Sequence, residues 1–183
     1  MAQSNHSNDR YHPASIGLHW LIALLIAAGF GLGTFMVDLP FSPSKLKYFS
    51  WHKWIGVTVF LLAVVRVIWR MTHPPPPALP APAWQLRIAH LTHWALYVLI
   101  IITPISGWIY SSSTGFQTVY LGLIPLPDLI GKDPSLKGPL KLVHLSLNYT
   151  MAALVALHAA AALKHHFIDR DGVLRRMLPG RAR

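Results

Sequence analysis

The chain has 183 residues, of which 53% are hydrophobic and only 12% are charged. A soluble domain carries about 25% charged residues, so the composition excludes an ordinary soluble domain and indicates an integral membrane protein. Cysteine is absent, which excludes disulfides, thiolate metal sites and covalent attachment of a cofactor through a C-x-x-C-H motif.

Four stretches are apolar enough to cross a membrane, for which a helix needs about 20 residues. The expected spans cover residues 16–37, 51–70, 87–110 and 142–166. The second carries Lys53 and Arg66 near its ends, where long side chains snorkel to the interfaces. The first lies where a signal peptide would, but it is longer than the usual apolar region and lacks a clear cleavage site, so we interpret it as retained. The predicted fold class is all-α, a single integral membrane four-helix bundle over residues 1–183.

Prolines mark the connections between these spans. Pro40 and Pro43 are expected to stop the first helix, and the run Pro74–Pro77 predicts a stiff, extended second loop. The third loop, residues 111–141, is the longest. Its apolar segment Phe116–Leu126 is expected either to lie on the membrane surface or to cover the bundle.

Basic residues indicate the orientation in the membrane. With four spans, both termini and the second loop share one side, together with Arg10, Arg66, Arg70, Arg87, Lys164, Arg170, Arg175, Arg176, Arg181 and Arg183. The other side carries only Lys45, Lys47, Lys53, Lys132, Lys137 and Lys141. The positive-inside rule then predicts cytoplasmic termini. Because the charges behind the net charge of +10 lie at membrane boundaries, the expected partner is anionic lipid and not nucleic acid.

The fourth span carries two histidines, His144 and His158, fourteen residues apart. A helix rises about 1.5 Å per residue, so they stand about 21 Å apart along its axis. Fourteen steps of about 100° end roughly 40° short of four full turns, so both project from nearly the same face. One imidazole is therefore expected near each membrane surface, which is the arrangement that two stacked haems require.

Two more histidines complete this pattern. His19 lies near the cytoplasmic start of the first span and His52 near the outer start of the second, so depth predicts the pairs His19/His158 and His52/His144. Each pair comes from two helices, as an axial pair around one haem iron requires. The alternative is packing against interfacial tryptophans, namely Trp20, Trp51 and Trp54. Small residues would let a macrocycle approach the backbone, although they also serve helix packing: Gly29, Gly31, Gly33 and Gly56.

These residues resemble the bacterial di-haem cytochrome b561 family, which includes the membrane-bound superoxide oxidase. The resemblance runs from Ile16 to Leu178. It is carried by the opening Ile16-Gly17-Leu18-His19-Trp20, by Val64-Val65-Arg66 and by Ala89-His90-Leu91-Thr92-His93. Further carriers are the spacing of His144 and His158, the following Ala-Ala-Ala-Ala-Leu-Lys-His165-His166, and the tail Asp171-Gly-Val-Leu-Arg-Arg-Met-Leu-Pro.

The resemblance implies that His19, His52, His144 and His158 ligate the iron of two non-covalent b-type haems. It also implies electron flow between the outer surface and a quinone in the bacterial inner membrane. In the superoxide oxidase, superoxide is oxidised outside and ubiquinone is reduced, so a superoxide oxidase-like oxidoreductase is the leading interpretation. The runner-up is a non-catalytic electron carrier or haem anchor subunit serving a partner redox protein. A metal transporter is disfavoured because no span carries an acidic residue.

Reduction of a quinone consumes two protons, and the pKa of a free histidine near 6.5 suits a proton relay. His165, two turns from His158 on the same face, is the first candidate for a quinone or proton site, and His90 and His93 follow. The alternative for all three is interfacial anchoring or contact with a haem propionate. Arg66 is expected to pair with a propionate or with lipid phosphate. The outer lysines are expected to attract a small anion such as superoxide, the alternative being ordinary solvated loop residues.

Overall fold

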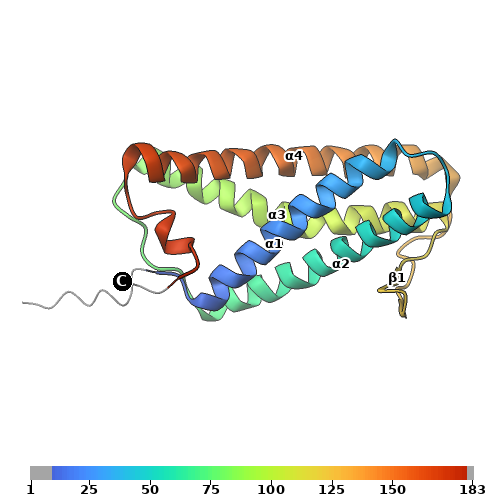
Figure 1. Ribbon diagram of the computed structural model, residues 1–183, viewed down its shortest axis with the longest axis horizontal. Helices are drawn as coiled ribbons and strands as arrows, with labels where there is room; N and C mark the ends of the chain where they lie inside the picture. Colours follow the sequence, from blue (N-terminus) through green and yellow to red (C-terminus); the bar gives the residue numbers. More distant parts are fainter. Residues whose placement is uncertain (1–9, 181–183) are drawn as a thin grey trace, which may run out of the picture.

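The computed structural model describes residues 10–180, and four long helices form its bundle (Figure 1). They are α1 (Pro13–Val37), α2 (Pro43–Thr72), α3 (Ala83–Thr114) and α4 (Lys137–Lys164). Helix α1 packs on α2, α3 packs on α4, and contacts between α2 and α3 join the two hairpins. All four helices are long and apolar enough to cross a membrane. The predicted all-α, integral membrane four-helix bundle is confirmed.

Each helix begins before its predicted span, α4 ends two residues before its predicted end, and one proline acts differently from the expectation. Pro43 does not stop the first helix, which ends at Val37; it begins α2. The backbone N–H that proline lacks has no intrahelical partner in the first turn of any helix, so Pro43 suits this position. Ser42 caps the same end, where its Oγ accepts a hydrogen bond of 3.2 Å from the Lys45 N–H.

The third loop forms a small hairpin beside the bundle. Strand β1 (Val119–Tyr120) pairs with β2 (Ile124–Pro125) in antiparallel register, and the 3-10 helix η2 (Pro134–Leu136) leads into α4. Figure 1 shows this hairpin projecting sideways from the end of the bundle, next to α2. The alternative in which Phe116–Leu126 covers the bundle is therefore wrong.

The C-terminal segment folds back on the opposite end of the molecule. It consists of the π-helical turn η3 (His165–Asp169) and the 3-10 helix η4 (Arg175–Met177). The indole Nε1 of Trp20 donates to the Met177 carbonyl at 2.7 Å, and Nη1 of Arg176 donates to the Pro77 carbonyl at 2.6 Å. The tail thus joins the start of α1 to the proline loop. Arg181 and Arg183, which count toward the predicted cytoplasmic charge, lie outside the described residues.

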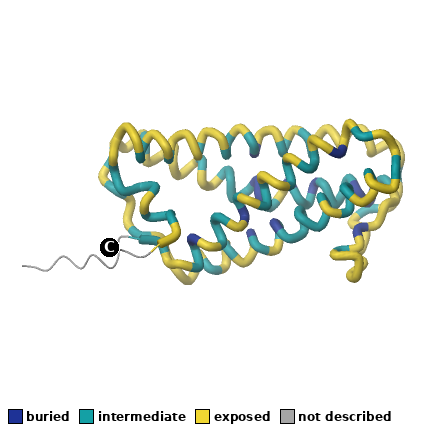
Figure 2. Tube along the Cα trace, viewed as in Figure 1, coloured by how far each residue is buried: buried dark blue, intermediate teal, exposed yellow. Residues whose placement is uncertain are grey.

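Buried residues follow the centre of the bundle, and the outer surfaces of the helices are exposed (Figure 2). The core cluster is small and consists of Ala63, Leu99, Ile100 and Met151. Large apolar side chains such as Leu24 and Leu157 are about two-thirds exposed, at 67% and 64%. Such a surface is unfavourable in water but suits hydrocarbon, so the distribution agrees with a protein whose surroundings are lipid.

Candidate functional site

The predicted outer pair meets between α2 and α4. The ring centroids of His52 and His144 lie 6.2 Å apart, and the two planes are nearly perpendicular, at 86°. Both residues are half-buried. They line a cavity inside the bundle to which all four helices contribute, with Gly29, Gly56 and Thr103 among its walls. The sequence-based pairing by depth therefore corresponds to two side chains that face one another.

Hydrogen bonds determine which nitrogen of each outer imidazole carries the proton. Nδ1 of His52 lies 3.0 Å from the Gly29 carbonyl, which only accepts, so Nδ1–H is the donor. Ser106 Oγ donates to the Thr103 carbonyl at 2.7 Å, and its lone pair then accepts from Nδ1–H of His144 at 2.9 Å. In both neutral rings the lone pair is left on Nε2. This is the tautomer that a metal-ligating histidine with an anchored second nitrogen adopts.

Two glycines make room for these imidazoles. A Cβ atom added at Gly107 would lie 2.8 Å from Cε1 of His144, and one added at Gly33 would lie 3.0 Å from Cε1 of His52. Real Cβ atoms essentially never approach closer than 3.0 Å. Gly31, two residues from Gly33, meets nothing within 4 Å. Of these two cradle glycines, Gly107 is required by the ring position of His144, whereas a methyl group at Gly33 would need the His52 ring to move by a few tenths of an ångström; Gly31 is not constrained.

The predicted inner pair also meets. His19 of α1 and His158 of α4 have ring centroids 6.2 Å apart at an angle of 57°. His93 of α3 packs edge-on against His158, with centroids 5.2 Å apart. Nδ1 of His19 is buried and has no hydrogen-bond partner within residues 10–180. An unpartnered buried nitrogen costs free energy unless a ligand or ion satisfies it, so this end of the bundle also points to a bound group.

The residues of both pairs fit an axially ligated haem. An imidazole nitrogen binds a first-row metal at about 2.0–2.1 Å, so two imidazoles on opposite sides of one iron have ring centres roughly 6 Å apart. Both pairs have centroids at 6.2 Å. The cradle glycines and the outer tautomers agree with the same ligand. Ligation itself stays a prediction.

Arg66 lies beside the inner pair and makes two hydrogen bonds within the protein. Its Nη1 donates to the Ser15 carbonyl at 2.8 Å, and its Nε donates to Tyr97 Oη at 3.2 Å. The guanidinium is close enough for its charge to act on His19 and His158. Such a fixed cation suits an anionic group at this end, and propionate contact remains a prediction.

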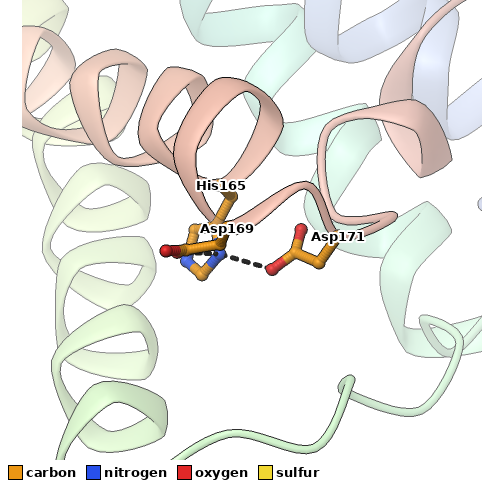
Figure 3. A group of neighbouring side chains, drawn as sticks. All are labelled: His165, Asp169 and Asp171. Carbon is orange, nitrogen blue, oxygen red and sulfur yellow. Dashed lines mark hydrogen bonds and ion pairs between the residues drawn. The ribbon is translucent and has the colours of Figure 1, made fainter.

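His165 sits in an acidic cluster at the end of α4 (Figure 3). Its Nδ1–H donates to Asp171 at 2.6 Å and lies 3.2 Å from Asp169, which also pairs with Lys164 at 2.6 Å. Partial burial acts to raise the pKa of Asp171, but the Val173 N–H and the His165 imidazole stabilise the carboxylate more, so its pKa lies below the usual value. A histidine held by a carboxylate is oriented for proton exchange.

The three secondary histidines are thus placed differently from one another. His93 contacts the inner pair, His165 lies in the acidic cluster, and His90 is exposed on α3. The sequence favoured His165 over His93, yet it is His93 whose ring contacts that of His158. A role for any of them in quinone or proton binding stays a prediction.

Three further site residues escaped the sequence reasoning. Ser106 and Gly107 contact His144 from α3, and no local pattern in the sequence marks them. Asn148 lies one turn after His144, where its Nδ2 is 3.2 Å from Nε2 and 2.7 Å from the carbonyl of that histidine. The i, i+4 spacing is the signal that would have found Asn148.

The outer lysines have individual partners. Nζ of Lys53 donates to the Phe116 carbonyl at 2.9 Å, and Lys45 donates to the carbonyls of Val37 and Leu39. Lys47 lies 5.0 Å from the ring centroid of Trp51. Within residues 10–180 none of these three lysines forms a close ion pair, although Lys53 interacts with the Asp128 charge, and the contacts hold the side chains near the helix ends.

Comparison with known proteins gives one consistent result. A family model described as prokaryotic cytochrome b561 matches residues 10–180. Cytochrome b561 homolog 2 of Escherichia coli K12 is 35% identical to this chain over 181 residues, covering 93% of this chain and 92% of that protein. The probable superoxide oxidase CybB of Yersinia pestis is 32% identical, covering 94% and 97%. Cytochrome b561 homolog 1 of Escherichia coli K12 is 30% identical, covering 94% and 99%.

Proposed function

The chain belongs to the prokaryotic cytochrome b561 family, and we propose that it is a di-haem b-type cytochrome of the bacterial inner membrane that passes electrons from periplasmic superoxide to ubiquinone. The observation that carries the proposal is the presence of two cross-helix histidine pairs, each with ring centroids 6.2 Å apart. The similarity to a probable superoxide oxidase supports the choice of donor.

In this proposal the four paired histidines hold two haems, one near each membrane surface. When bound, haem supplies an iron that takes up and releases one electron at a time. Gly29 and Ser106 anchor the outer imidazoles through Nδ1, and Gly33 and Gly107 leave the space that the rings occupy. Arg66 supplies a fixed positive charge beside the inner pair.

The overall reaction balances when two protons join two superoxide anions and one ubiquinone. Two superoxide anions each give up one electron and leave as dioxygen, and ubiquinone takes two electrons and two protons to become ubiquinol. His165, His90 and His93 are the groups we assign to the quinone and proton side. His93 contacts the inner histidine pair, so it lies beside the proposed inner haem site. His165 lies at the end of α4, where Asp171 holds it, so we place it on the side from which protons arrive.

The outer lysines serve the first step. Exposed cations raise the local concentration of a small anion and speed its arrival. At physiological salt their attraction is screened over about 8 Å. It therefore acts only on anions close to the lysines, and it weakens as the salt concentration increases.

Rapid mixing of the purified holoprotein with superoxide tests the proposal. We expect superoxide to reduce the haems, reduction to slow with rising ionic strength, and ubiquinone to reoxidise them. Lys53→Gln should slow reduction, whereas Arg87→Gln on the predicted cytoplasmic side should not. His165→Ala should leave reduction unchanged and slow reoxidation.

The outcomes separate the two interpretations of the chain. If the haems stay oxidised in the presence of superoxide, the superoxide oxidase-like activity is contradicted. The remaining interpretation is then a non-catalytic electron carrier or haem anchor subunit. If His165→Ala reoxidises at the normal rate, the quinone site lies elsewhere, and the same measurement on His93→Ala and His90→Ala follows. Insensitivity to salt and to Lys53→Gln rejects electrostatic attraction of the donor.

A further inference from the structure

The hairpin of the third loop presents an apolar tip to its surroundings. We define the hairpin tip as Leu121, Leu123 and Ile124, whose exposed fractions are 53%, 82% and 54%. The whole segment 116–126 contains no charged residue. Exposed apolar clusters of this kind mark a surface that meets a partner or a membrane.

Contacts with α2 determine the depth of the hairpin. Nε1 of Trp54 donates to the Val119 carbonyl at 2.7 Å, and the hydroxyl of Tyr120 lies 2.9 Å from Thr58 Oγ1. Thr58 is five residues beyond Lys53, or about 7–8 Å further along the helix. Between Lys53 and Arg66 the helix carries no charge. The hairpin therefore packs beside the membrane-embedded part of α2 and not above its charged end.

The hairpin is also held firmly at both of its arms. Nζ of Lys53 donates to the Phe116 carbonyl at 2.9 Å, and Nε1 of Trp108 donates to the Pro127 carbonyl at 3.0 Å. At the turn, Leu121 and Gly122 have φ of 53° and 74°, and Gly122 faces the Trp54 ring. The two tryptophans belong to a residue type enriched at membrane interfaces. The tip is thus fixed in position, away from the bundle core.

We propose that the hairpin tip inserts into the outer leaflet of the membrane, where lipid acyl chains cover Leu121, Leu123 and Ile124. Three observations favour lipid over a protein partner. The segment is uncharged, and it lies level with the apolar part of α2. Two lysines stand at its N-terminal base, Lys53 on the Phe116 carbonyl and Lys132 beside Gly115, and both suit lipid phosphate. The inference concerns membrane placement and is independent of the proposed redox function.

The absence of cysteine makes the test direct, because a single introduced thiol is the only labelling site. Leu123→Cys carries a nitroxide in the haem-loaded protein, reconstituted in vesicles of phosphatidylethanolamine and phosphatidylglycerol. Power-saturation spectroscopy then compares its accessibility to dioxygen, which concentrates in hydrocarbon, and to a water-soluble nickel chelate. Leu61→Cys, on the exposed side of α2, is the lipid control, and Lys137→Cys, at the start of α4, is the aqueous control.

We expect the label at position 123 to be several-fold more accessible to dioxygen relative to the chelate than the label at position 137, and to approach the label at position 61. Chelate accessibility equal to that at position 137 overturns the proposal, because the tip is then in water. Low accessibility to both reagents also overturns it, because a second protein copy or another chain then covers the tip. An unchanged haem spectrum in each variant verifies that the fold is intact.

Discussion

A hydrogen bond from Nδ1 of His52 to the carbonyl of Gly29, at 3.0 Å, connects α2 to α1 in the half of the bundle that is predicted to be outer. It anchors the imidazole whose ring centroid lies 6.2 Å from that of His144. Gly29 thus contributes its backbone as well as its small size. An imidazole anchored in this way is preorganised for metal binding, because the hydrogen bond fixes its tautomer and its orientation in the protein without the metal.

Replacing one histidine of a pair should remove one haem and leave the other. We expect His52→Ala and His144→Ala to lower the haem content from two per chain to one and to give the same residual spectrum. His19→Ala and His158→Ala should share a different residual spectrum. Pyridine haemochrome analysis and optical spectra measure both, with His90→Ala as an exposed control. Different residual spectra for His52→Ala and His144→Ala would show that the pairing by depth is wrong.

The cradle glycines predict a second, steric result. In Gly107→Ala the new methyl would lie 2.8 Å from Cε1 of His144, and overpacking of this kind costs about 1–3 kcal/mol. We expect the outer haem to be lost or weakly held, with a smaller effect for Gly33→Ala. Gly31→Ala, which meets nothing within 4 Å, should keep both haems. Full haem content and an unchanged melting temperature in Gly107→Ala would contradict the ring position.

Ser106 should tune the outer site through Nδ1 of His144. A hydrogen bond from Nδ1–H makes the imidazole more basic and favours ferric over ferrous iron, so Ser106→Ala should raise the midpoint potential of the outer haem only. Loss of such a partner weakens metal binding by about 10–100-fold. Potentiometric titration followed optically measures both effects. Ser113→Ala removes another buried hydroxyl of α3, bonded to the Tyr110 carbonyl, and should leave both potentials unchanged.

The arginine bias predicts that both termini are cytoplasmic. A reporter enzyme active only in the periplasm should be inactive when fused after residue 183 and active when inserted after Lys132 in the third loop. The two fusions control each other, because each should report the opposite compartment. Activity at the C-terminus with none at Lys132 would invert the inner and outer assignments throughout.

Helix-forming stretches and the depths of their histidines are determined by the sequence alone. A long apolar run must satisfy its backbone hydrogen bonds internally in lipid, so it forms a helix. The rise per residue then places His144 and His158 at opposite ends of α4 whatever the neighbours do. The same local reasoning failed at Pro43, because proline suits a helix start as well as a helix stop.

Only the tertiary structure decided which atoms meet. Hydrophobic residues are spread almost evenly around α1, α3 and α4, so no amphipathic face reveals the rotation of these helices about their axes. That rotation brings the Gly29 carbonyl to His52, Ser106 and Gly107 to His144, and His93 to His158. It also turns the Trp54 edge of α2 toward the hairpin. The sequence determined depth because depth follows from a local repeat, whereas the lateral contacts follow from packing among helices distant along the chain.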